Sequence, residues 1–243
     1  MTVGSLFSGI GGFDLGFERA GFDITWQVEI DDYANRVLAK HWPHVARYRD
    51  VRECGAANLA PVDVVVGGFP CQDISFAGAG AGLDGSRSGL WFEMRRIICE
   101  VGPRYVVVEN VAALLQRGLG RVLGDLADLG FDAEWSSLTA CAVGATHMRE
   151  RLFIVAYANG EHGRPRLRDS VARAFRPVQE IDGFASARAR AKARVENPSA
   201  LYGGADGLSD GFHRNHGIGN AVYPDVAEFI AHRILEAEER HVA

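Results

Sequence analysis

Short apolar runs rich in β-branched residues alternate with segments of helical periodicity along most of the chain. Runs typical of buried strands lie at residues 2–7, 24–30, 45–51, 62–66, 104–108, 131–140 and 152–157. Helical patterns lie at residues 13–20, 31–40, 89–101, 119–129 and 225–238. The pattern predicts an α/β protein with an open parallel sheet, in which ligands bind at the carboxyl ends of the strands.

The run at 62–66 leads into GGFPCQDIS, which places a cysteine on a stiffened turn at such a strand end. Gly67 and Gly68 end the run, and Pro70 fixes a backbone dihedral angle beside Cys71. The thiol is therefore positioned for chemistry. The alternative is a small buried apolar side chain, which is the usual state of a free cysteine.

A glycine-rich turn, SGIGG at residues 8–12, joins the first strand-like run to the first helical pattern. Strand, turn and helix together are typical of a nucleotide-binding start, although the glycines do not match GxGxxG. Glu29 follows about 20 residues later and suits ribose hydroxyls, or is a solvated carboxylate. Asp50 either accepts a hydrogen bond from a ligand amine or caps a turn.

Two later runs carry charged side chains at their ends, and the first brings Glu109 to the same sheet edge as Cys71. Glu109 follows the run at 104–108, where burial can raise its pKa and make it a proton donor; a salt-bridged structural glutamate is the alternative. Arg149 and Arg151 precede the last run and either bind a phosphate or carbonyl oxygen or carry surface charge. Residues 77–88, AGAGAGLDGSRS, form a loop able to close over a site, or a flexible connector.

Composition limits the class of protein. The chain has 243 residues, of which 47% are hydrophobic and 23% charged, so we expect one main domain with a small subdomain. The cysteines form no CxxC pair, which disfavours a zinc ribbon or disulfide scaffold and fits a reducing cytosol. We expect no signal leader and no membrane span. The cysteines are Cys54, Cys71, Cys99 and Cys141.

Local charge differs from the net charge of −5. Residues 164–194 hold nine Lys or Arg and three acidic residues, in a segment whose composition changes at Ala158. Such an excess suits contacts to phosphate, or marks a solvated helix face.

Together the motifs resemble those of the DNA (cytosine-5) methyltransferases of the small phage or bacterial type. The matching stretches are LFSGIGGFDLGFERAG, VEID, GGFPCQDIS, SRSGLWFE, VVVENV, RERLFIVA and GIGNAV, in the family's order. The resemblance implies a doubly wound, mostly parallel, Rossmann-like sheet that binds S-adenosylmethionine and releases S-adenosylhomocysteine. It implies a catalytic and cofactor-binding domain at 1–157, a target-recognition region at 158–212, and a segment at 213–243 that returns to the catalytic domain.

The resemblance also implies residue roles. Cys71 matches the nucleophile that adds to C6 of a flipped-out cytosine, and Glu109 matches the acid at the ring nitrogen. Arg149 and Arg151 match the arginines around the target base. No metal is implied. The positions that match the cofactor pocket are Phe7, Ser8, Gly9, Ile10, Gly12, Glu29, Ile30, Asp50, Val51, Pro70, Leu90, Asn220 and Val222.

The expected partner is double-stranded DNA, and we expect a monomer in the cytoplasm of a bacterium or phage-infected host, with a restriction enzyme as a partner in restriction-modification. Two alternatives differ in class. A catalytically inactive DNA-binding relative would tolerate loss of Cys71 or Glu109. A Rossmann-type oxidoreductase would explain the glycine turn and Glu29, but not the cysteine, Glu109 and the two arginines together.

Overall fold

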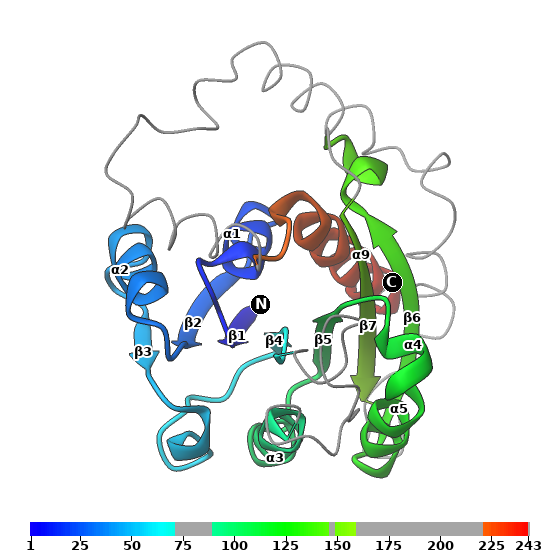
Figure 1. Cartoon of the computed structure of the whole chain (residues 1–243), viewed down its shortest axis with the longest axis horizontal. Helices are drawn as coiled ribbons and strands as arrows, with labels where there is room; N and C mark the ends of the chain where they lie inside the picture. The colour runs from blue at the N-terminus through cyan, green and yellow to red at the C-terminus, as the bar shows by residue number, and fades with distance from the viewer. Residues whose placement is uncertain (71–88, 146–148, 159–220, 243) are drawn as a thin grey trace.

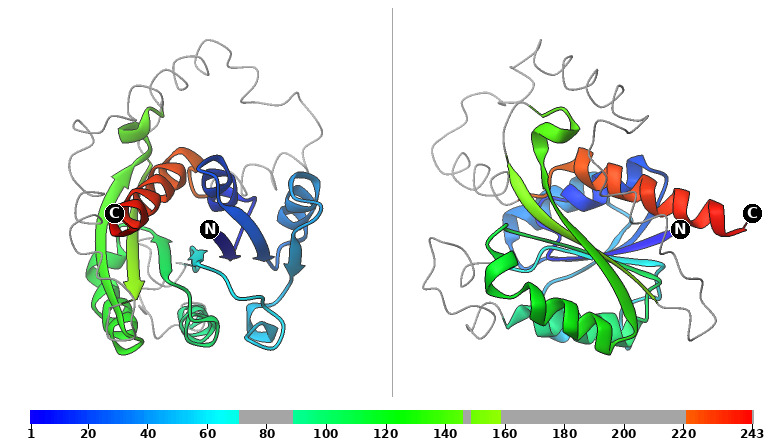
Figure 2. Two further views of the ribbon diagram at one scale, coloured as in Figure 1. Left: turned by 180° about the vertical axis from the view of Figure 1, so that it is seen from behind. Right: turned by 90° about the vertical axis from the view of Figure 1, so that its right-hand side faces the viewer.

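A seven-stranded sheet crosses the middle of the protein, with helices on both of its faces (Figures 1 and 2). The computed structural model describes residues 1–70, 89–145, 149–158 and 221–242. The strands are β1 (Thr2–Leu6), β2 (Asp23–Val28), β3 (Ala46–Tyr48), β4 (Val64–Gly67), β5 (Tyr105–Asn110), β6 (Phe131–Thr139) and β7 (Glu150–Ala158).

The strand order in the sheet is β3-β2-β1-β4-β5-β7-β6. All pairs from β3 to β5 are parallel, whereas β7 runs antiparallel to both β5 and β6. The chain leaves β1 toward β2 and β3 and returns on the other side of β1 as β4. The order therefore reverses between β1 and β4, which is where open α/β sheets bind their ligands. The mostly parallel, doubly wound sheet expected from the motifs is confirmed.

The helices divide between the two faces of the sheet. The described helices are α1 (Gly12–Arg19), α2 (Asp32–His41), η1 (Val51–Glu53), α3 (Leu90–Val101), α4 (Leu114–Arg117), α5 (Leu119–Asp128), η3 (Ala140–Val143) and α9 (Pro224–Val242). α1 and α9 cover one face, and α3 and α5 cover the other (Figure 2). None of the helices in the described ranges is long and apolar enough to cross a membrane.

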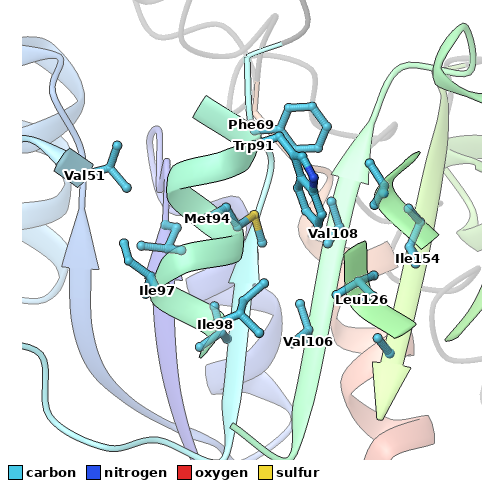
Figure 3. Packing of buried hydrophobic residues seen from close by; sticks show 14 of the residues in the cluster. Val51, Phe69, Trp91, Met94, Ile97, Ile98, Val106, Val108, Leu126 and Ile154 are labelled. Carbon is cyan, nitrogen blue, oxygen red and sulfur yellow. The ribbon is translucent and has the colours of Figure 1, made fainter. Parts of the chain in front are cut away.

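Apolar side chains fill the space between the sheet and each helical layer. On the α3 face, Trp91, Met94 and Ile98 pack against Val106 and Val108 of β5 (Figure 3). β4 and β5 are buried on both faces, which is why their sequences are continuous apolar runs instead of alternating ones.

Two of the predicted strands are shorter in the structure at an end that lies beside an aspartate. Of the run at 45–51, only Ala46–Tyr48 pairs with β2, since Asp50 turns the chain into η1. The run at 62–66 begins to pair at Val64, because the carboxylate of Asp63 accepts hydrogen bonds from the backbone N–H and the hydroxyl of Thr2. β3 therefore ends at Tyr48, before the end of the predicted run, whereas the carboxyl end of β4 lies at Gly67, next to the predicted end.

The last helix is fastened to the face of the sheet that α1 covers. A Cβ on Gly16 of α1 would lie 2.5 Å from the Cβ of Ala227, so only glycine allows the two helices to approach this closely. Arg19 of α1 forms an ion pair of 2.9 Å with Asp225 at the start of α9. Near its end, Glu238 accepts a hydrogen bond of 2.6 Å from the Tyr105 hydroxyl. Residues 221–242 therefore form part of the same folded unit as β1 and β5.

Candidate active site

The turn after β1 adopts a backbone conformation that few residues accept. Phe7 and Gly9 have φ angles of 53° and 56°. For a non-glycine residue such as Phe7 this conformation costs about 1–3 kcal/mol and is characteristic of ligand-binding sites. Ser8 holds the turn down, since its N–H donates to the Val28 carbonyl at 3.1 Å and its hydroxyl donates to the Ser5 carbonyl at 3.1 Å. The turn is thus fixed over the carboxyl ends of β1 and β2.

Glu29 lies beside this turn and is held by backbone donors. One carboxylate oxygen accepts from the Gly9 N–H at 2.7 Å, and the other accepts from the Asp31 N–H at 2.8 Å. Each oxygen keeps a second lone pair for a ligand hydroxyl. The neighbouring Ile30 is 62% exposed, which is unusual for a large apolar residue and offers a surface for a flat apolar ring.

Among the described residues, no heavy atom lies within 4 Å of the position that a Cβ on Gly9 would take. A carboxylate for paired hydroxyls, an exposed isoleucine and an open glycine turn form a set that fits a nucleoside. The residues present at this end of the sheet therefore fit the S-adenosyl group that the motifs imply.

A buried polar cluster supports the turn from below, and the sequence did not single it out. Asp14 of α1 accepts from the Ser5 hydroxyl at 3.1 Å and from the Gln27 side-chain amide at 2.8 Å. These bonds tie α1 to β1 and β2 directly beneath the turn. Burial raises the pKa of Asp14 to about 6, against the effect of both hydrogen bonds. The only signal in the sequence is the presence of polar residues within otherwise apolar patterns.

Of the other residues predicted to line the cofactor pocket, two touch each other and two pack in the hydrophobic core. A Cβ on Gly12 would lie 2.2 Å from the Val222 carbonyl oxygen, so these two predicted positions touch. Val51 is buried in the core, and Leu90 packs against the same cluster. Ile10 lies in the glycine turn, while Asn220 lies outside the described residues.

Asp50 shows the turn-capping contact that was one of its two interpretations. Its carboxylate accepts from the Arg52 backbone N–H at 3.0 Å and caps η1. The Arg52 guanidinium also binds it at 2.8 Å, and this hydrogen bonding holds the Asp50 pKa below its ordinary value.

Glu109 lies at the carboxyl end of β5, two strands away from β1, and is almost fully buried. A Cβ on Gly68 would lie 2.8 Å from a carboxylate oxygen of Glu109, so the glycine after β4 makes room for this side chain. Nε of Arg151 lies 3.0 Å from the other carboxylate oxygen. Burial raises the pKa of Glu109 to about 7, although Arg151 and Arg149 both act to lower it.

The antiparallel pairing of β7 explains the contact between Glu109 and Arg151. Asn110 pairs with Leu152 and Glu109 with Phe153, so the start of β7 lies beside the end of β5. The sequence placed Glu109 at the sheet edge of Cys71 but did not place the two arginines there, because it did not predict the direction of β7.

Asn110 ties the end of β5 to the turn after β4. Its side-chain amide donates to the Phe69 carbonyl at 3.1 Å, and its side-chain oxygen accepts from the Val111 N–H at 2.9 Å. Pro70 is the last described residue of this turn, and Cys71 lies outside the described residues. The chain therefore presents a buried acid, a guanidinium and the GGFP segment on the strands next to the glycine turn after β1, since Leu6 of β1 pairs with Gly67 of β4.

The sheet is Rossmann-like, and the strained turn after β1 and the buried acid at the end of β5 lie at the same edge of it. The family model for C-5 cytosine-specific DNA methylases matches residues 1–190. The chain belongs to this family.

Curated relatives are Type II methyltransferases. The chain is 35% identical over 164 residues to M2.BsuMI of Bacillus subtilis, a match that covers 64% of this chain and 42% of the relative. It is 37% identical over 167 residues to M.Eco47II of Escherichia coli, covering 65% and 40%. The chain therefore spans less than half the length of these relatives.

Solved structures share the fold. A putative DNA modification methyltransferase encoded within an E. coli prophage matches with a TM-score of 0.68 and 19% identity, covering 98% of this chain and 99% of that one. The Dnmt2 methyltransferase of S. pombe matches with a TM-score of 0.67 and 16% identity, covering 97% and 98%. At these identities the likeness concerns the fold alone.

Proposed function

We propose that the protein transfers a methyl group from S-adenosylmethionine to C5 of a cytosine in duplex DNA. The observation that carries the proposal is the environment of Glu109 in a chain of the cytosine-specific family. A buried carboxyl with a pKa of about 7, held by Arg151 at 3.0 Å, is able to give a proton to a ring nitrogen at neutral pH.

The methyl donor would bind at the carboxyl ends of β1 and β2. Glu29 would accept from the ribose hydroxyls, Ile30 would cover one face of the base, and the turn at residues 8–12 would face the rest of the group. We also propose that four further residues line this binding site: Asp50, Leu90, Asn220 and Val222. When bound, S-adenosylmethionine supplies the electrophilic methyl group that an activated cytosine C5 accepts.

Cytosine C5 is a poor nucleophile, so the protein must raise its electron density. In the proposed reaction the Cys71 thiolate forms a bond to C6, and the electron pair of the C5–C6 double bond becomes available at C5. Glu109 gives a proton to N3 and so neutralises the charge that would otherwise develop there. An arginine at the site, Arg149 or Arg151, polarises the O2 carbonyl of the base.

The reverse movement of the same groups completes the turnover. Once C5 carries the methyl group, loss of the C5 proton to a base restores the double bond and expels the Cys71 thiolate. Glu109 takes back the N3 proton. A base stacked in duplex DNA is out of reach of both side chains, so the cytosine is flipped into the site.

Target recognition and partners form part of the proposal. Residues 158–212 would hold the target-recognition element, because their basic excess suits phosphate contacts in a chain of negative net charge. We propose action as a monomer on duplex DNA in the cytoplasm of a bacterium or phage-infected host, beside a restriction enzyme. The names of the Type II relatives support this context.

The experiment incubates the protein with mixed-sequence duplex DNA and S-adenosylmethionine carrying a tritiated methyl group. The label should appear as 5-methylcytosine. Label on cytosine N4, on adenine or on no base would contradict the proposal. DNA that contains 5-fluorocytosine should form a covalent adduct, because the fluorine at C5 cannot leave as a proton.

Cys71→Ser tests the nucleophile. The variant should form no adduct and show no turnover while it still binds S-adenosylhomocysteine, because a serine hydroxyl is far less ionised than a thiol. An adduct that persists in this variant would assign the nucleophile to another residue.

A further inference from the structure

A buried hydrogen bond joins the first turn of α3 to α5, on the face of the sheet opposite α1. Nε1 of Trp91 donates to a carboxylate oxygen of Asp125 at 2.8 Å, and both residues are buried. Gly89, which precedes α3, has no side chain to cap the helix. The indole of Trp91 therefore provides the side-chain bond that fixes the start of α3 against its neighbour.

Asp125 is itself oriented by guanidinium groups. Nε of Arg121, one turn earlier in α5, donates to both carboxylate oxygens at 3.0 and 3.1 Å. Nε of Arg95 on α3 lies 3.6 Å from the same carboxylate. A hydrogen bond to a carboxylate is shorter and stronger than one between neutral groups, so the indole has little freedom to rotate.

The ring of Trp91 packs against Phe69, in the turn that leads to Cys71. Their ring centroids lie 5.4 Å apart at an interplanar angle of 50°, and Figure 3 shows the two rings side by side between α3 and β5. The Phe69 carbonyl is held from the other side by the Asn110 amide at 3.1 Å. This backbone is therefore held both from α3 and from the strand that carries Glu109.

A displacement of Phe69 would change the surroundings of the Glu109 carboxylate. Gly68 immediately precedes it, and the position of a Cβ on Gly68 lies 2.8 Å from the Glu109 carboxylate. Because Gly68 has no side chain, its backbone packs directly against the Glu109 carboxylate, and a shift of the turn would change this contact.

We propose that Trp91 and Asp125 are positioning residues for methyl transfer, which act by fixing Phe69 and with it the turn between β4 and the nucleophile relative to Glu109. This role rests on the proposed function. It differs from a contribution to stability alone, because it requires the rate of the chemical step to depend on the hydrogen bond between the two side chains.

The variants separate the hydrogen bond from the packing. Trp91→Phe keeps an aromatic ring against Phe69 and removes the N–H donor. Asp125→Leu removes the acceptor at similar volume, and Asp125→Asn keeps an oxygen that can accept from the indole. Ile98→Val, in the same helix and core cluster, is the matched control for loss of packing.

The measurements are the single-turnover rate with saturating S-adenosylmethionine and DNA, the dissociation constants of S-adenosylhomocysteine and of DNA, and the melting temperature. Trp91→Phe and Asp125→Leu should lower the single-turnover rate about ten- to a hundredfold, the scale of a small misplacement of reacting groups. Both dissociation constants should change less than about threefold, since binding is not what is lost.

Asp125→Asn should keep the wild-type rate, and Ile98→Val should keep it in spite of a lower melting temperature. The double variant Trp91→Phe/Asp125→Leu should be no slower than the slower single variant, because both act through one bond.

Wild-type rates in Trp91→Phe and Asp125→Leu would overturn the positioning role. The role would also be overturned if Ile98→Val lost as much single-turnover rate per degree of lowered melting temperature as Trp91→Phe. Should Asp125→Leu fail to fold, Trp91→Phe alone decides, since it keeps most of the buried ring. Wild-type protein that methylates no cytosine would overturn the proposed function itself, which distinguishes the two failures.

Discussion

Glu29 and Glu109 stand at the carboxyl ends of parallel strands in the two halves of the sheet, and their surroundings are opposite. Glu29 faces the turn after β1, where the backbone N–H groups of Gly9 and Asp31 bind its two oxygens. Glu109 is 7% exposed and faces the Arg151 guanidinium. Two backbone donors make Glu29 a hydrogen-bond acceptor, whereas burial raises the pKa of Glu109 to about 7.

The difference shows how one residue type supports two tasks at one sheet edge. At Glu109, burial favours the neutral form and the arginines favour the charged form, and the burial is the larger effect. The result is a carboxyl that exchanges a proton near neutral pH. In the proposed function, Glu29 holds the methyl donor while Glu109 moves a proton on the target base.

The largest expected effect is that of Glu109→Gln on methyl transfer. An amide is able to donate a hydrogen bond to N3 but cannot transfer a proton, so the single-turnover rate should fall about 10²- to 10⁴-fold. DNA binding should be nearly unchanged in a gel-shift titration. An unchanged rate would remove Glu109 from the mechanism.

Glu134 of β6 provides a matched control for this substitution. Burial also raises its pKa to about 7, but it lies on the edge strand, away from β5. Glu134→Gln should therefore keep the wild-type rate. A comparable loss of rate in both variants would mean that removal of any glutamate with a raised pKa slows the reaction, and Glu109 would then have no specific role as an acid.

The next effect concerns stability. The folded-state pKa of Glu109 lies above its ordinary value of 4.5. Between these two pKa values the folded protein holds the proton, whereas the unfolded chain has lost it. The stability of the wild type should therefore fall as pH rises from about 4.5 to about 7. Glutamine resembles the protonated side chain, so Glu109→Gln should be more stable than the wild type by about 3 kcal/mol at pH 8.

This difference should disappear near pH 4, where both states of the wild type are protonated at this position. Urea unfolding of wild type and variant at the two pH values measures it. A variant that is less stable than the wild type at pH 8 would show that the ion pair with Arg151 outweighs burial, and the assignment of Glu109 as an acid would fail.

The smallest expected effect is that of Glu29→Gln. One of the two backbone donors loses its acceptor, and so does one ribose hydroxyl, so the dissociation constant of S-adenosylhomocysteine should rise about tenfold. The rate at saturating S-adenosylmethionine should stay close to the wild type. Titration calorimetry measures this constant. The control is Asp32→Asn, since the side chain of Asp32 is 82% exposed in the wild type. A lower saturating rate with unchanged affinity would reverse the roles of the two glutamates.

Much of this arrangement could be predicted from the sequence, because it depends on local patterns. Apolar runs mark the buried strands, and polar residues that follow such runs, such as Glu29 and Glu109, fall at one edge of a parallel sheet. Asp31 was expected near the start of the second helix, and its side chain caps α2 by accepting from the Ala34 N–H.

The remaining features depend on contacts between distant segments. The antiparallel direction of β7 places Arg151 on Glu109, and nothing in either segment alone specifies that direction. In the same way, Trp91 and Asp125 lie 34 positions apart, and only Trp91 fits the apolar pattern of its helix, whereas Asp125 is a charged residue at a buried position. Only the packed structure shows that the two side chains share a hydrogen bond.

The most direct test is a titration of the glutamate carboxyl groups by carbon-13 NMR, in the wild type and in Glu109→Gln. A carboxyl signal that titrates near pH 7 in the wild type and is missing from the variant is the expected result. If the signal that the variant lacks instead titrates near pH 4.5 in the wild type, Glu109 is an ordinary ionised carboxylate. It would then share the role of a hydrogen-bond acceptor with Glu29 and could not protonate the base.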